Sequence, residues 1–141
     1  MTLSEASRLP ATLMQAMLRG ARFHCPRCDQ KGLFARYLKP SPRCSHCGQD
    51  WTLHQADDFP PYVSMFLTGH LMAPVIIEVS SNDSLSLAVK LGITFGIGSV
   101  LMIGLLQPAK GAIIALQWWM GMHGFRPAGR DEAEAVFGPK A

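Results

Sequence analysis

Charged residues are scarce in this chain. Asp, Glu, Lys and Arg together make up 16% of its 141 residues, whereas about 25% is usual for soluble domains. Hydrophobic residues make up 48%, and long uncharged runs follow position 58. This balance argues against a single soluble core and favours a small helical membrane protein.

Motifs for catalysis are also missing. The sequence holds no recognisable nucleophile and base pair, no phosphate-binding loop and no haem-attachment motif. We therefore expect no enzyme activity, and the sequence identifies no small-molecule substrate. No nucleic-acid partner is expected either, because the positive-inside rule for membrane proteins already accounts for the basic residues of the N-terminal part.

Cysteine occurs at only four positions, and no secretory leader is expected beside it. Glu5, Arg8 and Gln15 interrupt the apolar positions of the first 20 residues, and no small-residue cleavage site follows an apolar run. The cysteines are therefore expected to stay reduced in the cytoplasm. A disulfide framework is disfavoured on this ground.

The four cysteines form two Cys-x-x-Cys pairs, Cys25 with Cys28 and Cys44 with Cys47, and 15 residues separate the pairs. Each pair is short enough for one tight turn to point two thiolates at one place, and two such turns complete a tetrahedral site suited to Zn²⁺. The spacing predicts a structural zinc site. Disulfides, free thiols, an iron–sulfur centre and a redox dithiol are the alternatives.

The residues around the cysteines agree with a structural metal. Asp29 and Gly48 follow the pairs directly, where such a turn needs a positive φ. A segment of about 35 residues is too small to bury an adequate core, and a structural zinc ion adds on the order of 10 kcal/mol to its folding. His24 and His46 can ligate in principle, but four cysteines already complete the shell, so we expect both to face solvent or a partner.

Two apolar stretches long enough to cross a bilayer follow. Residues 57–80 hold the first expected span, and residues 85–107 hold the second. The polar turn at residues 80–84 joins them, so the spans form a hairpin and both chain ends lie on one side. Gly92 and Gly96 of the second span either reflect ordinary glycine use in membrane helices or allow another helix to approach closely.

The distribution of basic residues predicts the orientation. Eight of the 13 basic residues precede position 60 and four follow the second span, whereas the turn between the spans has only Lys90 near it. The positive-inside rule then places both termini and the cysteine pairs in the cytoplasm.

The flanking segments complete the expected organisation. Residues 1–20 show the spacing of an amphipathic helix, which either packs on the cysteine domain at residues 21–56 or lies on the bilayer or on a partner. Residues 125–141 form a polar tail. The expected fold class is membrane α: a two-helix transmembrane hairpin with a small N-terminal, cytoplasmic, zinc-ribbon-like (β-knuckle) domain and interfacial helices.

Residues 108–124 are apolar but too short to cross a bilayer alone. They contain Trp118 and Trp119, and tryptophan favours the membrane interface. We expect a surface helix here, or a bent extension of the second span, with Lys110 directed toward headgroups.

Ionisable residues at the first span are further candidates for function. His54, Asp57 and Asp58 precede it, and His70 and Glu78 lie within it. The carboxylates either cap the helix and pair with basic residues of the cysteine domain, or bind a second cation with His54. Either His70 forms a hydrogen bond within the hairpin and the Glu78 side chain extends to water at the surface, or both residues contact another protein at membrane depth.

Several motifs, taken as a series, resemble the bacterial inner-membrane family known as domain of unknown function 983. They are Cys25-Pro26-Arg27-Cys28, Gly32-Leu33-Phe34, Cys44-Ser45-His46-Cys47-Gly48, residues 54–61, Gly69-His70, Pro108-Ala109-Lys110-Gly111 and Ala115-Leu116-Gln117. The resemblance covers about residues 20–122. It implies a zinc-ribbon-like head on two membrane helices, genes that often neighbour those of haem-copper oxidases in alphaproteobacteria, and no established activity.

The hypothesis that follows is a non-catalytic zinc-binding protein of the bacterial inner membrane. Its expected partners are membrane lipids and a larger integral membrane complex of the haem-copper oxidase type, which it serves as an accessory subunit or assembly factor. The alternative is a membrane-bound enzyme or metal carrier with a second metal at His54, Asp57 and Asp58.

Overall fold

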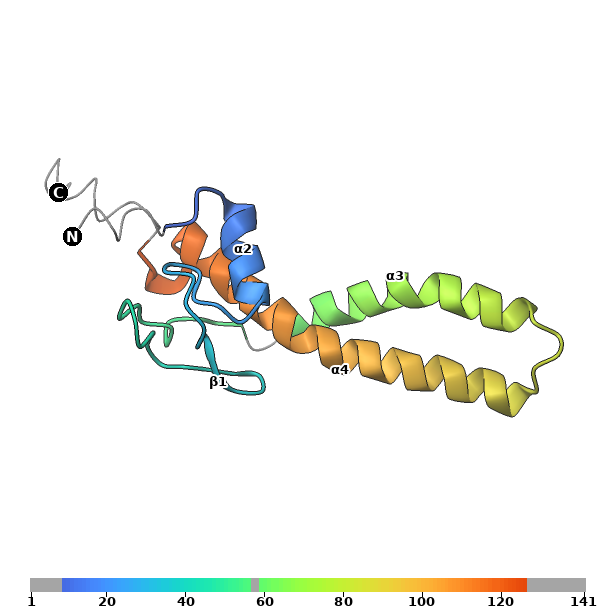
Figure 1. Cartoon of the computed structure of the whole chain (residues 1–141). Helices are drawn as coiled ribbons and strands as arrows, with labels where there is room; N and C mark the ends of the chain where they lie inside the picture. Colours follow the sequence, from blue (N-terminus) through green and yellow to red (C-terminus); the bar gives the residue numbers. More distant parts are fainter. Residues whose placement is uncertain (1–8, 57–58, 127–141) are drawn as a thin grey trace, which may run out of the picture.

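The computed structural model describes residues 9–56 and 59–126, and it shows a small head at one end of a long helical hairpin (Figure 1). The elements, in chain order, are α2 (Leu13–Ala21), β1 (Phe34–Arg36), β2 (Lys39–Pro40), α3 (Phe59–Ser81), α4 (Leu87–Met120) and the 3-10 helix η1 (Met122–Gly124). Two of these helices, α3 and α4, are long and apolar enough to cross a membrane.

Helix α3 has the length of one membrane span. Its 23 residues extend about 35 Å, and a bilayer core is about 30 Å thick. Pro60 lies in the first turn, where a missing N–H breaks no helical bond. Pro74 lies inside the helix, so the carbonyl of His70 lacks its usual hydrogen bond. Its bounds agree with the first expected span, whose residues 57 and 58 lie outside the described part.

Helix α4 is longer than a bilayer is thick. Its 34 residues extend about 51 Å. None of residues 87–108 is buried, whereas most of residues 109–118 are. The first part therefore has the surface of a membrane span, and the second part has the surface of a core helix.

No break separates residues 107 and 108, because α4 continues through Pro108 to Met120. Of the two alternatives for residues 108–124, the extension of the second span is the one observed. A proline removes one helical hydrogen bond, and its ring crowds the carbonyl of the residue four positions earlier, which here is Gly104. The burial of the following turns in the head then offsets the lost bond.

Helices α3 and α4 pack along a narrow polar and small-residue face. Ser64, Thr68 and Met72 are the buried residues at this face of α3, together with Pro60 at its start. The Ser64 hydroxyl donates to the carbonyl of Met102 at 2.9 Å. Hydrogen bonds between helices of this kind are typical of membrane helix pairs.

The glycines of the second span have no part in this contact. A Cβ atom built on Gly92 or Gly96 meets nothing within 4 Å among the residues that the structure describes. The close approach of another helix that these glycines permit is therefore not used by α3.

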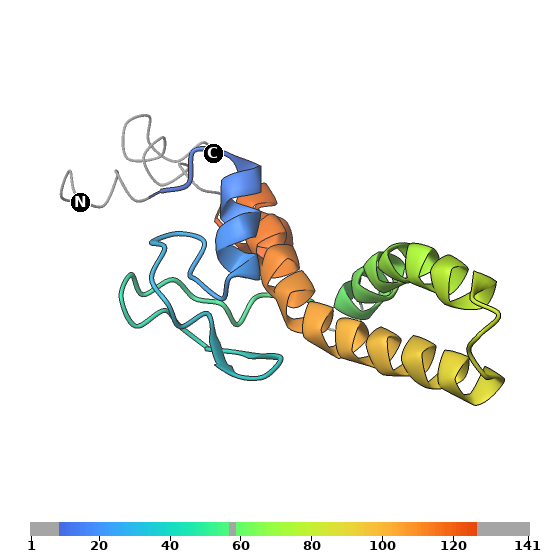
Figure 2. The same ribbon diagram turned by 45° about the vertical axis from the view of Figure 1, so that its right-hand side comes forward.

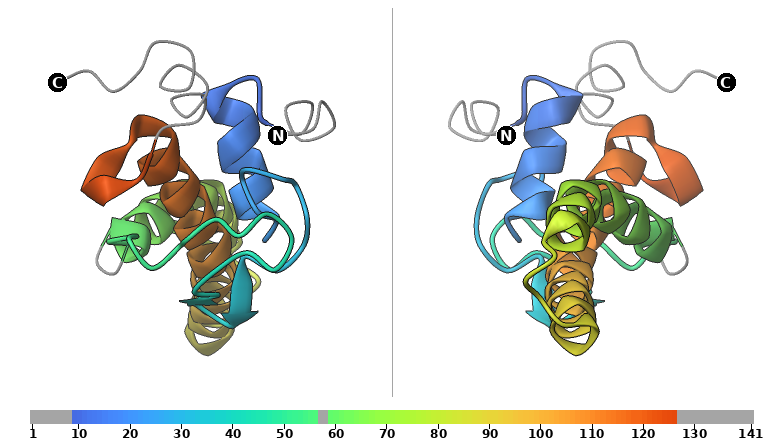
Figure 3. Two further views of the ribbon diagram at one scale, coloured as in Figure 1. Left: turned by 90° about the vertical axis from the view of Figure 1, so that its left-hand side faces the viewer. Right: turned by 90° about the vertical axis from the view of Figure 1, so that its right-hand side faces the viewer.

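The head packs on the buried half of α4. Helix α2 lies beside this half (Figure 2), and seen along the hairpin α4 contacts α2 and α3 on different sides (Figure 3). The shared core joins α2, the cysteine domain, α4 and Phe125; its buried members are Ala16, Cys25, Cys28, Leu33, Cys44, Trp51, Ala56, Ile113, Ile114, Ala115, Trp118 and Phe125. The described part of the N-terminal helix thus packs on α4.

Trp118 does not lie at a membrane interface, as its residue type suggested. It is 2% exposed, and its ring meets Trp51 edge-on at a centroid distance of 6.1 Å. Trp51 in turn lies 6.0 Å from the ring of Phe125. The expectation of an interfacial helix was wrong for Trp118, because an aromatic cluster with the head buries it.

Candidate metal centre

The two cysteine pairs lie on two turns with the same hydrogen-bond pattern. In the first, the amide of Cys25 donates to the carbonyl of Gln30 at 2.8 Å, and the amide of Asp29 donates to the carbonyl of Cys25 at 2.9 Å. Both bonds close within six residues, so the turn depends on local sequence alone. We name this turn, residues 24–31, the first knuckle.

The second knuckle, residues 43–50, repeats the arrangement. The amide of Cys44 donates to the carbonyl of Gln49 at 2.9 Å, and the amide of Gly48 donates to the carbonyl of Cys44 at 3.0 Å. An isolated β-bridge closes each knuckle, His24 with Lys31 and Arg43 with Asp50.

The positive φ expected after each cysteine pair is confirmed. The φ angle is 60° at Asp29 and 70° at Gly48. Aspartate adopts this region less readily than glycine, but here its carboxylate makes contacts that a glycine cannot. It lies 3.6 Å from Arg19 of α2 and 3.1 Å from Nδ1 of His24. Asp29 therefore ties the first knuckle to α2.

The four sulfur atoms converge on one point. All four lie within 4.8 Å of one another, and Cys25 with Cys47 and Cys28 with Cys44 are each 3.7 Å apart. A tetrahedral ion with metal–sulfur bonds of about 2.3 Å separates its ligands by about 3.8 Å. No disulfide joins the four cysteines. The sulfurs thus form a candidate metal site that fits a tetrahedral ion.

Hydrogen bonding makes the thiols unequal before a metal binds. The hydrogen bond to Cys47, with burial in the same direction, raises the pKa of Cys25 far above its usual range. The same bond lowers the pKa of Cys47 to about 5. Burial raises the pKa of Cys28 to about 11. Cys47 is therefore the ligand that is already a thiolate at neutral pH, and metal binding must displace protons elsewhere in the site.

The burial of the ligands fits a structural role. Cys25, Cys28 and Cys44 are buried and Cys47 is half-buried. Three of them belong to the core that also contains Leu33 and Trp51. A metal ion held here would link the two knuckles to each other and both to α4.

The flanking histidines lie outside the sulfur cluster. His24 contacts Asp29, and His46 is exposed. Among the described residues, the four cysteines are the group of His, Cys, Asp and Glu side chains that can hold a metal together.

The residues expected to hold a second cation are not brought together by the described part of the chain. Nδ1 of His54 lies 2.5 Å from the carbonyl of Trp51, so that nitrogen is occupied within the head. Asp57 and Asp58 lie outside the described residues. Lys110 is half-buried on α4, within the head rather than on an interfacial helix.

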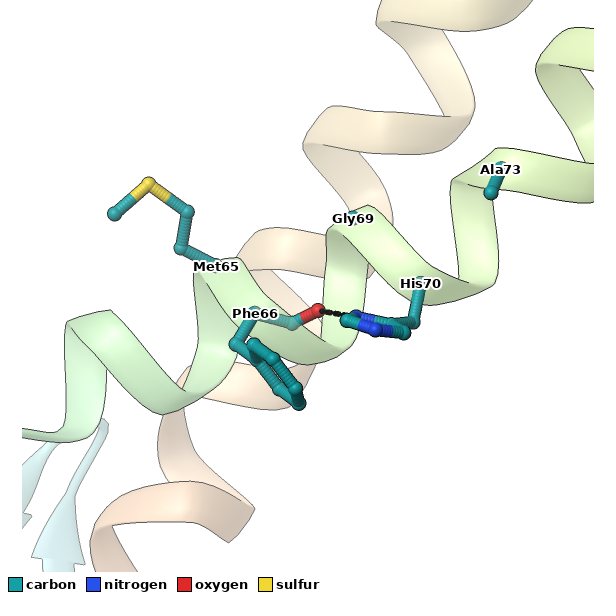
Figure 4. A pocket seen from close by; sticks show the side chains of 5 residues that line it. All are labelled: Met65, Phe66, Gly69, His70 and Ala73. Atoms are coloured by element: carbon teal, nitrogen blue, oxygen red, sulfur yellow. Dashed lines mark hydrogen bonds between the residues drawn. The ribbon is translucent and has the colours of Figure 1, made fainter.

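The ionisable residues of the first span face away from α4. His70 and Glu78 are both exposed on α3. Nδ1 of His70 lies 2.9 Å from the carbonyl of Phe66 on the same helix, and the two rings lie 4.2 Å apart. His70 lines a shallow hollow of about 420 Å³ together with Met65, Phe66, Gly69 and Ala73. Figure 4 shows these five residues on α3, with the hydrogen bond between His70 and Phe66.

Two contacts between the head and α4 had not been predicted from the sequence. The side chain of Gln117 accepts from the amide of Gln55 at 3.0 Å and donates to its carbonyl at 2.9 Å. The hydroxyl of Tyr37 donates to the carbonyl of Ile103. A sequence signal for the Gln117 contact existed, because Gln117 is a lone amide side chain within the apolar run 112–122. No sequence signal marked the Tyr37 contact.

A zinc-ribbon-like head on a hairpin of two membrane-length helices defines the class of this protein. Residues 34–118 match the family model described as "Protein of unknown function (DUF983)". Because this match covers more than half of the chain, the protein belongs to that family, as its motifs predicted. No curated protein and no solved structure matches the chain.

Proposed function

We propose that this protein is a non-catalytic, zinc-binding subunit or assembly factor of a larger integral membrane complex, and that a haem-copper oxidase is the complex to test first. The observation that carries the proposal is the outward-facing His70 at the middle of α3. The basic residues of the head favour a cytoplasmic location for the knuckles, and the proposal sets the hairpin in the inner membrane.

Among the residues that the structure describes, one ring nitrogen of His70 has no hydrogen-bond partner, and the side chain is exposed on α3. Since a carbonyl can only accept, Nδ1 donates its hydrogen to Phe66, and Nε2 of the uncharged ring then carries a lone pair. The residue lies at the midpoint of the 23-residue helix, where lipid tails offer no hydrogen bond. Polar groups at such depth are costly and mark functional sites. The face of α3 around His70 therefore favours a protein partner that supplies a hydrogen-bond donor.

The surroundings of His70 suit a helix as that partner. Gly69 and Ala73 are small and exposed, and small residues allow helix backbones to approach closely in membranes. The larger side chains of Met65 and Phe66 flank the hollow. We name this surface, residues 65, 66, 69, 70 and 73, the His70 face.

The choice of zinc and of an oxidase rests on chemistry and on the family. Four converging thiolates in a reducing compartment favour Zn²⁺, and one zinc per chain by elemental analysis, with no visible absorption band, tests this against an iron centre. The oxidase is proposed because the family resemblance implies gene neighbourhoods with haem-copper oxidases.

Site-specific photocrosslinking in the native membrane tests the proposed partner. A photoreactive phenylalanine analogue replaces Phe66 in the His70 face, and in the control it replaces Phe95 of α4; these residues are 65% and 71% exposed. We expect Phe66 to crosslink to a defined membrane subunit, identified by mass spectrometry, and Phe95 to label lipid. Equal labelling from both positions, or lipid adducts alone, would contradict the proposal.

Substitution of His70 separates hydrogen bonding from shape. His70→Phe removes the acceptor and should abolish the Phe66 crosslink and co-purification, whereas His70→Gln keeps an acceptor and should retain part of both. Unchanged zinc content in both variants shows that the head is intact. A partner retained fully by His70→Phe would exclude the hydrogen bond as the basis of binding.

A further inference from the structure

The tip of the β1–β2 hairpin has an unusual composition for a turn. Tyr37 and Leu38 connect the two strands, whereas glycine, asparagine and aspartate are favoured in such turns. Leu38 has a φ angle of 58°, a region that a leucine enters at a cost. Tyr37 is 52% exposed. The turn thus presents aromatic and apolar side chains at a position where a solvated turn usually has polar residues or glycine.

The hairpin tip lies beside the membrane span. Figure 1 shows the hairpin at β1 extending along α4, and the hydroxyl of Tyr37 donates to the carbonyl of Ile103 within the apolar half of α4. This bond fixes the tip at a definite level of the helix.

That level can be compared with the bilayer. A hydrocarbon core of about 30 Å centred on His70 ends about ten residues away, near Pro60. Because Ser64 bonds to Met102 across the antiparallel pair, Pro60 is level with about residue 106 of α4. Ile103 then lies about 5 Å inside the boundary. A tyrosine at this depth has the position typical of interfacial anchors.

Two positive charges lie at the same tip. Arg36 and Lys39 are directly opposite each other in the antiparallel pair, and both are exposed. Like charges at opposed positions destabilise a strand pair. No ion pair joins either residue to a carboxylate within the described chain. An anion between them would remove this repulsion, and the anion present at the boundary of a bilayer is a lipid phosphate.

We propose that the β1–β2 tip binds the phosphate of an anionic glycerophospholipid between Arg36 and Lys39, with Tyr37 and Leu38 against the upper acyl chains. The hairpin then fixes the depth of the head on the membrane as well as bracing α4. This inference does not depend on the partner proposed for the His70 face.

Native mass spectrometry of the full-length protein, delipidated in detergent, tests the lipid site. The protein is titrated with phosphatidylglycerol and, separately, with phosphatidylcholine of the same acyl chains. Each basic residue near an anionic surface contributes a factor of about 5 to binding. The variant Arg36→Gln/Lys39→Gln should therefore weaken phosphatidylglycerol binding about 30-fold and leave phosphatidylcholine binding unchanged.

The control variant Lys31→Gln/Arg43→Gln removes the same net charge from the two knuckles and should retain the wild-type affinity. Zinc content and thermal unfolding of each variant show that the head remains folded. Equal binding of the two lipids by the wild type, or equal loss in the two double variants, would overturn the proposal.

A last arm distinguishes a lipid from a free phosphate compound. Glycerol 3-phosphate has the charged group without acyl chains, so it should not displace phosphatidylglycerol at equal concentration. Displacement by it would show that the acyl chains, and with them Tyr37 and Leu38, make no contribution.

Discussion

Gly20 of α2 and Gly111 of α4 face each other with no side chain between the two backbones. A Cβ atom added to either residue overlaps the carbonyl oxygen of the other, and one added to Gly111 also comes within 3.3 Å of the Phe34 ring. Both glycines are buried. A methyl group at either position can fit only if the two helices move apart. The crossing of these glycines thus sets the position of α2 on the head.

We expect Gly20→Ala and Gly111→Ala each to lower the free energy of unfolding by about 1–3 kcal/mol, the usual cost of overpacking. Thermal unfolding in detergent, followed by near-ultraviolet circular dichroism, measures the loss. The control is Gly104→Ala on the same helix, where an added Cβ meets nothing within 4 Å among the described residues. Because alanine favours helix over glycine, that variant should be as stable as the wild type or slightly more stable. A matching loss in all three variants would mean that the crossing is not the cause.

The Gln117 side chain holds the segment before α3 onto α4 through two hydrogen bonds to the main chain of Gln55. Gln117 is buried, at 7% exposed, whereas Gln55 is exposed, so each lost hydrogen bond costs about 0.5–1.5 kcal/mol. We expect Gln117→Leu, which keeps the volume, to destabilise the head by about 1–3 kcal/mol. Hydrogen exchange of the Gln55 amide, measured by mass spectrometry, should rise in this variant.

The matched control for this prediction is Gln107→Leu, ten residues earlier on α4 and only half-buried. It should leave both stability and exchange at Gln55 unchanged. Rapid exchange at Gln55 in the wild-type protein would contradict the two-bond arrangement itself.

The parts of this fold that depend on local sequence could be predicted. The knuckles follow from a four-residue spacing and one residue of positive φ, so Asp29 and Gly48 were identifiable without a partner in space. The spans follow from length and hydropathy, which is why the bounds of α3 agree within two residues with the expected ones. The family motifs could be recognised for the same reason.

The parts that depend on distant contacts could not be predicted. The composition of an apolar segment with two tryptophans does not tell whether lipid headgroups or a protein core surround it. Trp118 is buried because it packs on Trp51, which is far away in sequence. A glycine near the end of a helix usually serves as its cap, yet Gly20 lies within α2 and Arg22 is the residue at the cap. The close approach of Gly111 explains why a glycine is needed at position 20, inside the helix.

Removal of the metal should loosen the knuckles and leave the membrane hairpin intact. The ligands link residues 24–31 to residues 43–50, and few other hydrogen bonds join the two knuckles in the described chain, whereas α3 and α4 pack on each other without them. After treatment with a strong chelator, we expect fast hydrogen exchange in both knuckles and unchanged protection around Ser64 and Met102. Cys25→Ser should reproduce this pattern. His46→Ala, next to a ligand but exposed, should keep its metal; loss of metal from it would show that the histidine ligates.

The unequal thiols predict how metal uptake depends on pH. The ordinary pKa of a cysteine here is 9.0, and the hydrogen bond from Cys25 lowers that of Cys47 to about 5. A group whose pKa is lowered in the folded head holds its stabilising charge as pH falls, until pH passes about 5. Between pH 6 and pH 8 Cys47 thus has no proton to release, and Zn²⁺ uptake by the folded, metal-free head should release no more than three protons. Isothermal titration calorimetry in buffers of different ionisation enthalpy gives this number. Below pH 5 Cys47 is protonated as well, so Zn²⁺ uptake releases a fourth proton and the affinity should fall more steeply with acidification. Release of four protons at pH 7 would show that Cys47 titrates like an ordinary thiol.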